Sequence, residues 1–298
     1  MVDTVIETRD LRKAYGAIDA VRGLDLRVAA GSICGFLGRN GAGKTTTMKM
    51  LLGLTRRTSG VARVFDRDVE GPRSGVAIRA RTAFVSDEKD LYDAMTVDDI
   101  VRFTASFFPA WRADAERQYR DRFELRGSQR VKTLSRGMRT KLAVLLALCR
   151  GADLLMLDEP TSGLDPAAAE EVLQAIVSQV AQHGVTVFFS SHQLAEVEQI
   201  ADDIAIIDQG RLVVSGSIET LREEFRRIHL VFEGDAPPYV FAAPGVRRVR
   251  RDGRVLSVLS SGGTAGLLDE ARALQPTSVE VVPVTLKEIF LESVLTEE

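Results

Sequence analysis

The chain has 298 residues, of which 45% are apolar, and a formal net charge of −3 with acidic and basic residues interleaved. A chain of this size and apolar content can bury a full core, and about 150 residues per domain predicts one large domain with a smaller appendage. The small negative charge argues against nucleic acid as a main partner, so none is expected.

Neither a membrane span nor a secretion signal is indicated. The longest apolar stretch covers residues 142–149, far short of the roughly 20 residues needed to cross a bilayer. Residues 1–4 lack the basic region and apolar core of a signal peptide. Cys34 and Cys149 lie in apolar surroundings without metal-ligand spacing, so we expect two buried, reduced thiols and a cytoplasmic protein.

Strand-like patterns open the chain. From residue 2 to about 65, short β-branched runs such as 33–37 alternate with glycine-bearing turns. Residues 44–54 predict a helix, whereas residues 96–149 carry apolar side chains at helical period with few strand signals. We therefore expect a helical subdomain at about 90–150, between two β-rich stretches.

A βαβ unit is predicted next. Residues 154–157 and 185–189 are continuous apolar runs typical of buried parallel strands, and the alanine-rich segment 166–182 between them predicts a helix. Asp165 is the expected N-cap, with Pro166 at the first helical position.

Beyond residue 226 the pattern changes to short strands around a turn-rich segment, followed by an amphipathic helix from about Thr285. Thr285 and Glu288 form a capping-box pattern. We assign residues 226–298 to a small αβ accessory or regulatory domain. The arginine pairs 247–248 and 250–251 could contact anionic lipid or a partner, but such clusters are more often a solvated strand edge.

A phosphate-loop pattern follows the strand at 33–37. Residues 38–45 fit G-x-x-x-x-G-K-[ST], between an apolar strand and a helix. Backbone amides of such a loop face nucleotide phosphates, Lys44 would neutralise their charge, and Thr45 would offer a hydroxyl to Mg²⁺. ATP and Mg²⁺ are therefore the expected cofactors. The predicted ATP-binding residues of this loop are Gly38, Arg39, Asn40, Gly41, Ala42, Gly43, Lys44, Thr45 and Thr46.

Two acidic residues end the run at 154–157. A carboxylate at the C-terminal end of a buried strand can reach a phosphate-bound metal, so Asp158 is expected to bind Mg²⁺ together with Thr45. Glu159, one residue on, is the candidate to polarise the attacking water as a general base or orienting group. Two buried acids kept for structure alone would need basic partners that the apolar run does not supply.

Three further segments narrow the possible classes of nucleotide-hydrolysing protein. Leu-Ser-Arg-Gly-Met at 134–138 opens a helix upstream of Asp158, Thr-Ser-Gly-Leu-Asp at 161–165 follows Glu159-Pro160, and Ser191-His192 follows the run at 185–189. In this order and spacing, over about residues 2–225, the chain resembles the ATPases of ABC transporters.

The resemblance implies an α/β fold and an ATP-hydrolysing enzyme. Residues 1–225 would form a phosphate-loop NTPase core with an N-terminal antiparallel β subdomain and an inserted helical subdomain. Two cassettes of this family pack head to tail, so the second cassette would be an identical copy or a paralogue. The signature residues Ser135, Arg136, Gly137 and Met138 would then contact the ATP held by the opposite cassette.

The same resemblance assigns three single residues. Asp165 corresponds to the D-loop, and His192 to a switch histidine that holds the γ-phosphate or the attacking water. Tyr15 occupies the place of the aromatic residue that stacks on adenine.

The chain departs from the family pattern at two positions. Asp87 stands where a glutamine usually reaches Mg²⁺ and the membrane partner, and its carboxylate can still accept from metal-bound water, so Asp87 stays a magnesium candidate. Arg136 replaces the first glycine of the signature, which adds positive charge near the opposing phosphate and stiffens the turn.

The predicted function is an ATPase that powers transport, in the export direction, through a separate membrane permease. The chain would lie peripherally on the inner face of the cell membrane. The signature variant, Asp87 and the segment 285–291 resemble the ATPases of type-2 exporters. A soluble ABC-type ATPase acting on ribosomes or DNA is the alternative, disfavoured because the chain has neither a second cassette nor a heptad run. A small-molecule kinase would leave the signature unexplained.

Overall fold

The structure is a computed structural model that describes residues 3–71, 73–262 and 264–294. The start of the predicted strand-rich stretch at residue 2 lies outside the described residues, as do the outer ends of the two predicted domains, residues 1 and 298. Within the described residues, no helix is long and apolar enough to span a membrane.

The chain divides into two compact units, Met1–Ser215 and Gly216–Glu298. The division falls before the expected boundary at residue 225. The reason is local: the short helix α8 (Ile218–Glu224) follows the division and packs on β12 (Phe225–Val231), the first strand of the second unit's sheet.

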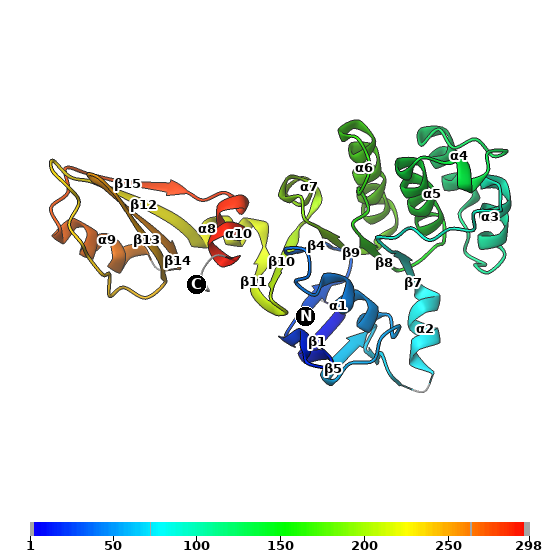
Figure 1. Cartoon of the computed structure of the whole chain (residues 1–298), viewed down its shortest axis with the longest axis horizontal. Coiled ribbons are helices and arrows are strands. Elements are labelled where there is room, and N and C mark those ends of the chain that lie inside the picture. Colours follow the sequence, from blue (N-terminus) through cyan, green and yellow to red (C-terminus); the bar gives the residue numbers. More distant parts are fainter. Residues whose placement is uncertain (1–2, 72, 263, 295–298) are drawn as a thin grey trace. The chain divides into compact units, whose positions relative to one another are not determined.

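The first unit opens with an antiparallel sheet in the order β2-β1-β5-β6, with β3 paired to β1. Its strands are β1 (Thr4–Tyr15), β2 (Ile18–Leu24), β3 (Arg27–Ala29), β5 (Ser59–Val64) and β6 (Arg67–Asp68). The predicted N-terminal antiparallel subdomain is therefore present. The helix α1 (Lys44–Leu51) contacts β2 and β5 of this sheet and β8 of the next, so it packs between the two sheets (Figure 1).

The second sheet of this unit has the order β11-β10-β4-β9-β8-β7, and the neighbours from β10 to β7 pair in parallel. Every residue of β4, β8 and β9 is buried, as expected for parallel strands covered on both faces. The strands are β4 (Ile33–Leu37), β7 (Thr82–Val85), β8 (Leu154–Asp158), β9 (Thr186–Ser191), β10 (Asp203–Asp208) and β11 (Arg211–Ser217).

Helices cover this parallel sheet. The helix α6 (Pro166–His183) connects β8 to β9, and its N-cap Asp165 accepts from the main-chain N–H of Ala168 at 2.9 Å, so the predicted βαβ unit and its cap are confirmed. Further helices on this sheet include α2 (Ser74–Arg81), which contacts β7, and α7 (Leu194–Ile200), which contacts β4 and β9. The core that this sheet shares with α1 and the antiparallel sheet includes the rings of Phe36 and Phe188, whose centroids lie 5.1 Å apart.

A group of helices extends beyond β7, in the range predicted for the helical subdomain (Figure 1). It comprises α3 (Val97–Ala105), α4 (Ala113–Arg122), the 3₁₀ turn η1 (Val131–Thr133) and α5 (Arg136–Leu148). The helix α5 is central, because it contacts α3, α4, α6 and β7. It is also the helix that carries the signature residues at its first turn.

The second unit contains an antiparallel sheet in the order β13-β14-β12-β15. Its remaining elements are β13 (Val246–Asp252), β14 (Val255–Ser261), α9 (Thr264–Ala273), β15 (Ser278–Pro283) and α10 (Leu286–Val294). The capping box of α10 is confirmed, since Glu288 accepts from the N–H of Thr285 at 2.8 Å and the N–H of Glu288 donates to the Thr285 hydroxyl at 3.2 Å.

Both cysteines are free and buried, as predicted. Burial raises the pKa of the Cys149 thiol to about 12 and that of Cys34 still further. Both thiols are therefore neutral near pH 7 and behave as small apolar core residues.

Candidate nucleotide site

The phosphate loop joins the buried strand β4 to α1. Gly43 forms the N-cap of α1 with φ of 108°, a conformation that favours glycine, and a Cβ at this position would lie 2.5 Å from the carbonyl oxygen of Ala20. The turn therefore requires glycine both for its backbone conformation and for space. It leaves the first N–H groups of α1 at the loop, where the helix dipole favours an anion.

Lys44 lies largely buried beneath this loop. Its ammonium donates to the carbonyl oxygen of Gly38 at 2.8 Å and lies 3.9 Å from the Glu159 carboxylate. Burial lowers the pKa of Lys44, while the neighbouring carboxylates of Glu159, Asp158 and Asp87 act in the opposite direction. A bound polyphosphate would add negative charge at this point and so favour the charged ammonium.

Asp158 ends β8 and faces the start of α1. The Thr45 hydroxyl donates to one oxygen of the Asp158 carboxylate at 2.6 Å, and the Ser190 hydroxyl donates to the other at 2.6 Å. The parallel register pairs Asp158 directly with Ser190 on β9. The sheet thus brings the ends of β4, β8 and β9 to one edge, where ligands bind in open α/β sheets.

Glu159 turns away from Asp158 because its backbone is left-handed, with φ of 51°. Its N–H donates to the Ser190 hydroxyl at 3.0 Å, and its carboxylate lies 2.7 Å from Nδ1 of His192. With the carboxylate ionised, Nδ1 carries the proton and donates. The second ring nitrogen of His192 is then an acceptor in the neutral ring and a donor in the protonated ring.

A hollow of about 190 Å³ gathers most of the predicted nucleotide-site residues. It brings the loop together with Asp87, which follows β7, and with Asp158 and Glu159 at the end of β8. The lining residues are Ala20, Arg39, Asn40, Gly41, Gly43, Lys44, Thr45, Thr46, Asp87, Asp158 and Glu159.

The oxygen donors of this hollow fit Mg²⁺. Thr45, Asp158 and Asp87 offer a hydroxyl and two carboxylates, the hard ligands that Mg²⁺ prefers. Among the described residues, no group of three or more histidine, cysteine or acidic side chains is arranged to hold a metal by itself. Mg²⁺ is commonly bound by one or two carboxylates together with nucleotide phosphates and water.

Four predicted residues lie apart from the walls of this hollow. Tyr15 is 49% exposed at the end of β1, with the Lys13 ammonium 4.5 Å from its ring centroid. Gly38 and Ala42 belong to the loop but do not line the hollow. His192 reaches the site only through its contact with Glu159.

The signature residues line a second hollow of about 400 Å³, together with Gly163, Leu164 and Asp165 of the predicted D-loop. Ser135 is the N-cap of α5, and its hydroxyl accepts from the N–H of Met138 at 3.2 Å. The first turn of α5 thus presents a helix N-terminus, and the phosphate loop lies instead at the start of α1. In the residues that the structure describes, the two hollows share no lining residue.

Arg136 points toward the D-loop of its own chain. Its guanidinium donates to the Ser162 hydroxyl at 2.8 Å, and its side chain packs over Gly163. This contact joins the first turn of α5 to the D-loop segment. The charge of Arg136, however, is directed to Ser162 within the same subunit.

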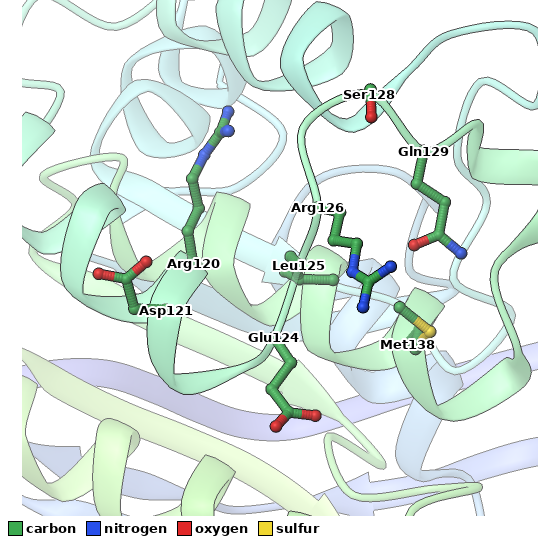
Figure 2. Close-up of a pocket in the computed structure, with 8 residues that line it drawn as sticks. All are labelled: Arg120, Asp121, Glu124, Leu125, Arg126, Ser128, Gln129 and Met138. Carbon is green, nitrogen blue, oxygen red and sulfur yellow. The ribbon is translucent and has the colours of Figure 1, made fainter.

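Another hollow lies on the helical subdomain beside the signature. Figure 2 shows the Arg126 side chain extending toward Met138, with Glu124 and Gln129 on the surrounding loop. Arg120, on α4, is held by ion pairs with Asp98 and Glu116. Met138 is shared with the signature hollow, so the two open next to each other at the start of α5.

A narrow groove of about 150 Å³ separates the segment after β7 from α5. Its walls include Phe84, Leu91, Phe108 and Ala147. Beside it lies an exposed aromatic cluster, in which Phe103 makes edge contacts with Tyr92 at 5.6 Å and with Phe107 at 5.0 Å between ring centroids.

Two buried polar residues of the nucleotide site were not predicted. Ser190 holds both Asp158 and the main chain of Glu159, and Lys89 donates to the main-chain carbonyls of the same two residues. Burial lowers the pKa of Lys89 to about 8, although the nearby acids act in the opposite direction. Ser190 had a weak signal, a polar residue at the end of an apolar strand. Lys89 had none, because it lies in a charged run typical of a solvated loop.

Comparisons with known proteins place the sequence among transport ATPases. The family described as ABC transporter matches residues 21–162. The bacitracin transport ATP-binding protein BcrA of Bacillus licheniformis is 32% identical, with 98% of this chain and 96% of that protein aligned. The daunorubicin resistance ATP-binding protein DrrA3 of Streptomyces coeruleorubidus is 34% identical, with 99% and 95% aligned. Both alignments therefore include the second unit.

Solved structures match the first unit. The ATP-binding subunit of an ABC transporter superposes with a TM-score of 0.66 and 28% identity over 74% of this chain and 92% of that one. A dimeric ATP-binding cassette in a post-hydrolysis state, bound to ADP and phosphate, superposes with a TM-score of 0.65 at 18% identity over 72% and 98%. At that identity the second match establishes the fold alone.

Proposed function

The chain belongs to the family of ABC transporter ATP-binding subunits, and from this premise we propose that it drives export through a separate membrane permease. It is an ATPase of the ABC type. The observation that carries the assignment is the hollow in which the phosphate loop meets Asp158 and Glu159. The relatives that align over nearly the whole chain are named for bacitracin transport and daunorubicin resistance, which supports export as the direction.

We assign nucleotide binding to the phosphate loop. Its backbone amides and the N-terminus of α1 surround the β- and γ-phosphates, and Lys44 neutralises their charge. Thr45, Asp158 and Asp87 would hold Mg²⁺, which would screen the negative charge of the phosphates during hydrolysis. Tyr15, exposed at the end of β1, supplies a ring for stacking on adenine.

Glu159 is the residue we assign to water activation. Its carboxylate extends from a left-handed backbone away from the metal ligand Asp158, and His192 fixes its direction by a 2.7 Å contact. A positioned carboxylate of this kind orients the water and accepts its proton as the water attacks the γ-phosphate. His192 has a second ring nitrogen for the phosphate or the water.

A second cassette completes the site. The signature and D-loop residues surround an anion-binding helix N-terminus that shares no lining residue with the phosphate-loop hollow of the same chain. We infer that this N-terminus receives the γ-phosphate of ATP bound to a partner cassette. ATP then joins the two cassettes, and its cleavage removes the contacts that hold them.

The permease docks in the groove between α5 and the segment after β7. The groove has both apolar and polar lining residues, and together with the exposed aromatic cluster of Tyr92, Phe103 and Phe107 it suits an amphipathic helix of a membrane protein. Docking would hold the chain peripherally at the inner face of the membrane. The second unit serves as an accessory domain that regulates the cassette or assists its dimerisation.

The test is to recover the partner from native membranes. A tagged Glu159→Gln variant is expected to bind ATP, hydrolyse it slowly and copurify with a multi-spanning protein that mass spectrometry identifies. The matched control adds Tyr92→Glu, which places a charge in the aromatic cluster but leaves the nucleotide hollow intact. We expect this double variant to bind ATP and lose the membrane protein. Recovery of ribosomes, nucleic acid or no partner by Glu159→Gln would contradict the transport assignment.

A further inference from the structure

A buried lysine joins the segment after β7 to the end of β8. Lys89 is 6% exposed, and its ammonium donates to the main-chain carbonyl oxygens of Asp158 at 3.0 Å and Glu159 at 2.9 Å. Lysine normally keeps its charged end in water, because burying a cation is costly. Its placement here is specific, since both acceptors belong to the turn that carries the two acids of the nucleotide site.

That turn determines where the two carboxylates point. Asp158 faces Thr45 and Ser190, whereas Glu159 faces His192. Glu159 adopts a left-handed conformation, which a residue with a side chain keeps only when its surroundings hold it. By binding two successive carbonyls, the Lys89 ammonium fixes both peptide groups and so the direction of both side chains.

Lys89 also belongs to the groove. Lys89 lines it together with Leu91, while Asp87, two residues earlier, lines the nucleotide hollow. The turn is tight, because Lys89 has φ of 51° and its N–H donates to the carbonyl of Ser86 at 3.3 Å. A displacement of this turn would therefore move the Lys89 side chain and the carbonyls that it binds.

We propose that Lys89 is a positioning residue that couples occupancy of the groove to the direction of the Asp158 and Glu159 carboxylates. The coupling rests on the proposed function, in which the occupant of the groove is a helix of the permease. A helix that presses on the segment 86–91 shifts the Lys89 ammonium. The carbonyls of the turn follow, and Glu159 moves relative to the attacking water.

The first experiment measures ATP hydrolysis by the full-length chain alone. Lys89→Met keeps an unbranched side chain that is one heavy atom shorter and removes its donors. We expect kcat to fall by about tenfold or more, as when an outer hydrogen-bond partner of an active-site ligand is lost. The KM for ATP should change by less than about twofold, because the phosphate loop is untouched. Lys89→Arg should restore part of kcat, and Lys287→Met, on the exposed side of α10, should match the wild type.

Two results would overturn the positioning role. One is an unchanged kcat in Lys89→Met. The other is a loss of kcat accompanied by a large fall in melting temperature that Lys89→Arg does not repair, since Lys89 would then act through folding alone.

A second experiment separates the coupling from the proposed function. The membrane protein recovered with Glu159→Gln is added back, and its stimulation of ATP hydrolysis is compared between wild type and Lys89→Met. We expect stimulation of the wild type and almost none of the variant. Equal stimulation of both would overturn the coupling and leave the transport function standing. If the wild type is not stimulated, permease docking and coupling both fail, while the kinetics of the isolated chain still decide the positioning role.

Discussion

At the scale of single residues, the nucleotide site depends on polar side chains at the ends of adjacent parallel strands. Lys44 and Thr45 follow β4, Asp158 ends β8 and Ser190 lies near the end of β9. The first three could be predicted, because motif spacing specifies residue type and order. Ser190 could not be predicted, because its contacts depend on strand register. Lys89 could not be predicted either, because its contacts depend on a turn that brings together positions 69 or more residues apart.

Substitution of Ser190 tests whether the geometry of the nucleotide site depends on strand register. Its hydroxyl donates to Asp158 and accepts from the N–H of Glu159, so Ser190→Ala frees one oxygen of the predicted metal ligand and leaves a buried N–H without its acceptor. We expect the Mg²⁺ concentration for half-maximal ATP hydrolysis to rise by about tenfold or more. A magnesium titration of the ATPase rate measures the change.

The matched control for that titration is Ser178→Ala. The Ser178 hydroxyl donates to Gln174 within α6, away from the nucleotide hollow. It should leave the magnesium dependence unchanged. If the Mg²⁺ concentration for half-maximal ATP hydrolysis is unchanged in Ser190→Ala, the Thr45 contact alone is enough to position Asp158.

At the scale of elements, local signals decided which parts could be predicted. The helices α6 and α10 have capping residues that the sequence shows directly. The strand β13 is rich in arginine and lacks apolar alternation, so the sequence does not predict a strand over its full length. In the structure, arginines of this sheet form ion pairs with α10. Arg248 of β13 and Arg227 of β12 lie 2.7 and 3.8 Å from the Glu292 carboxylate on α10, whose side chain is 9% exposed.

These arginines therefore hold α10 on the sheet, and the expected solvated edge is partly an ion-pair network. Glu292→Ala removes the shared acceptor. We expect the second unit to lose about 1–3 kcal/mol of unfolding free energy, the usual cost of leaving buried or charged donors without a partner. Urea unfolding followed by far-UV circular dichroism should show an earlier transition, because this unit contributes a sheet and three helices.

Trp111, the single tryptophan, lies in the first unit and provides the internal reference for this experiment. Its fluorescence transition should stay where it is in the wild type. Glu233→Ala, an exposed acid between β12 and β13, is the matched variant and should leave both transitions unchanged. An equal shift of both probes in Glu292→Ala would mean that the two units unfold together.

At the scale of the whole molecule, the proposed function makes the cassette half of a site. The signature hollow contains an N-capped helix start and a D-loop but lacks phosphate-loop residues, whereas the nucleotide hollow contains the phosphate loop and lacks the signature. The motif order predicted both parts and the need for a partner. The boundary of the second unit was harder to predict from the sequence, because the residues of a short helix such as α8 do not indicate which unit it packs against.

Dimerisation driven by ATP follows from this division and is testable at Ser135. In the Glu159→Gln background, ATP should shift the elution and scattering mass from one chain of 32.6 kDa to twice that value. Adding Ser135→Asp preserves the N-cap of α5, because aspartate caps as well as serine, but places a negative charge where the partner's γ-phosphate would bind. We expect this variant to remain monomeric with ATP. Ser135→Asn caps the helix without the charge and should dimerise. Dimers of the Ser135→Asp variant at the same ATP concentration would show that the signature does not meet the phosphate.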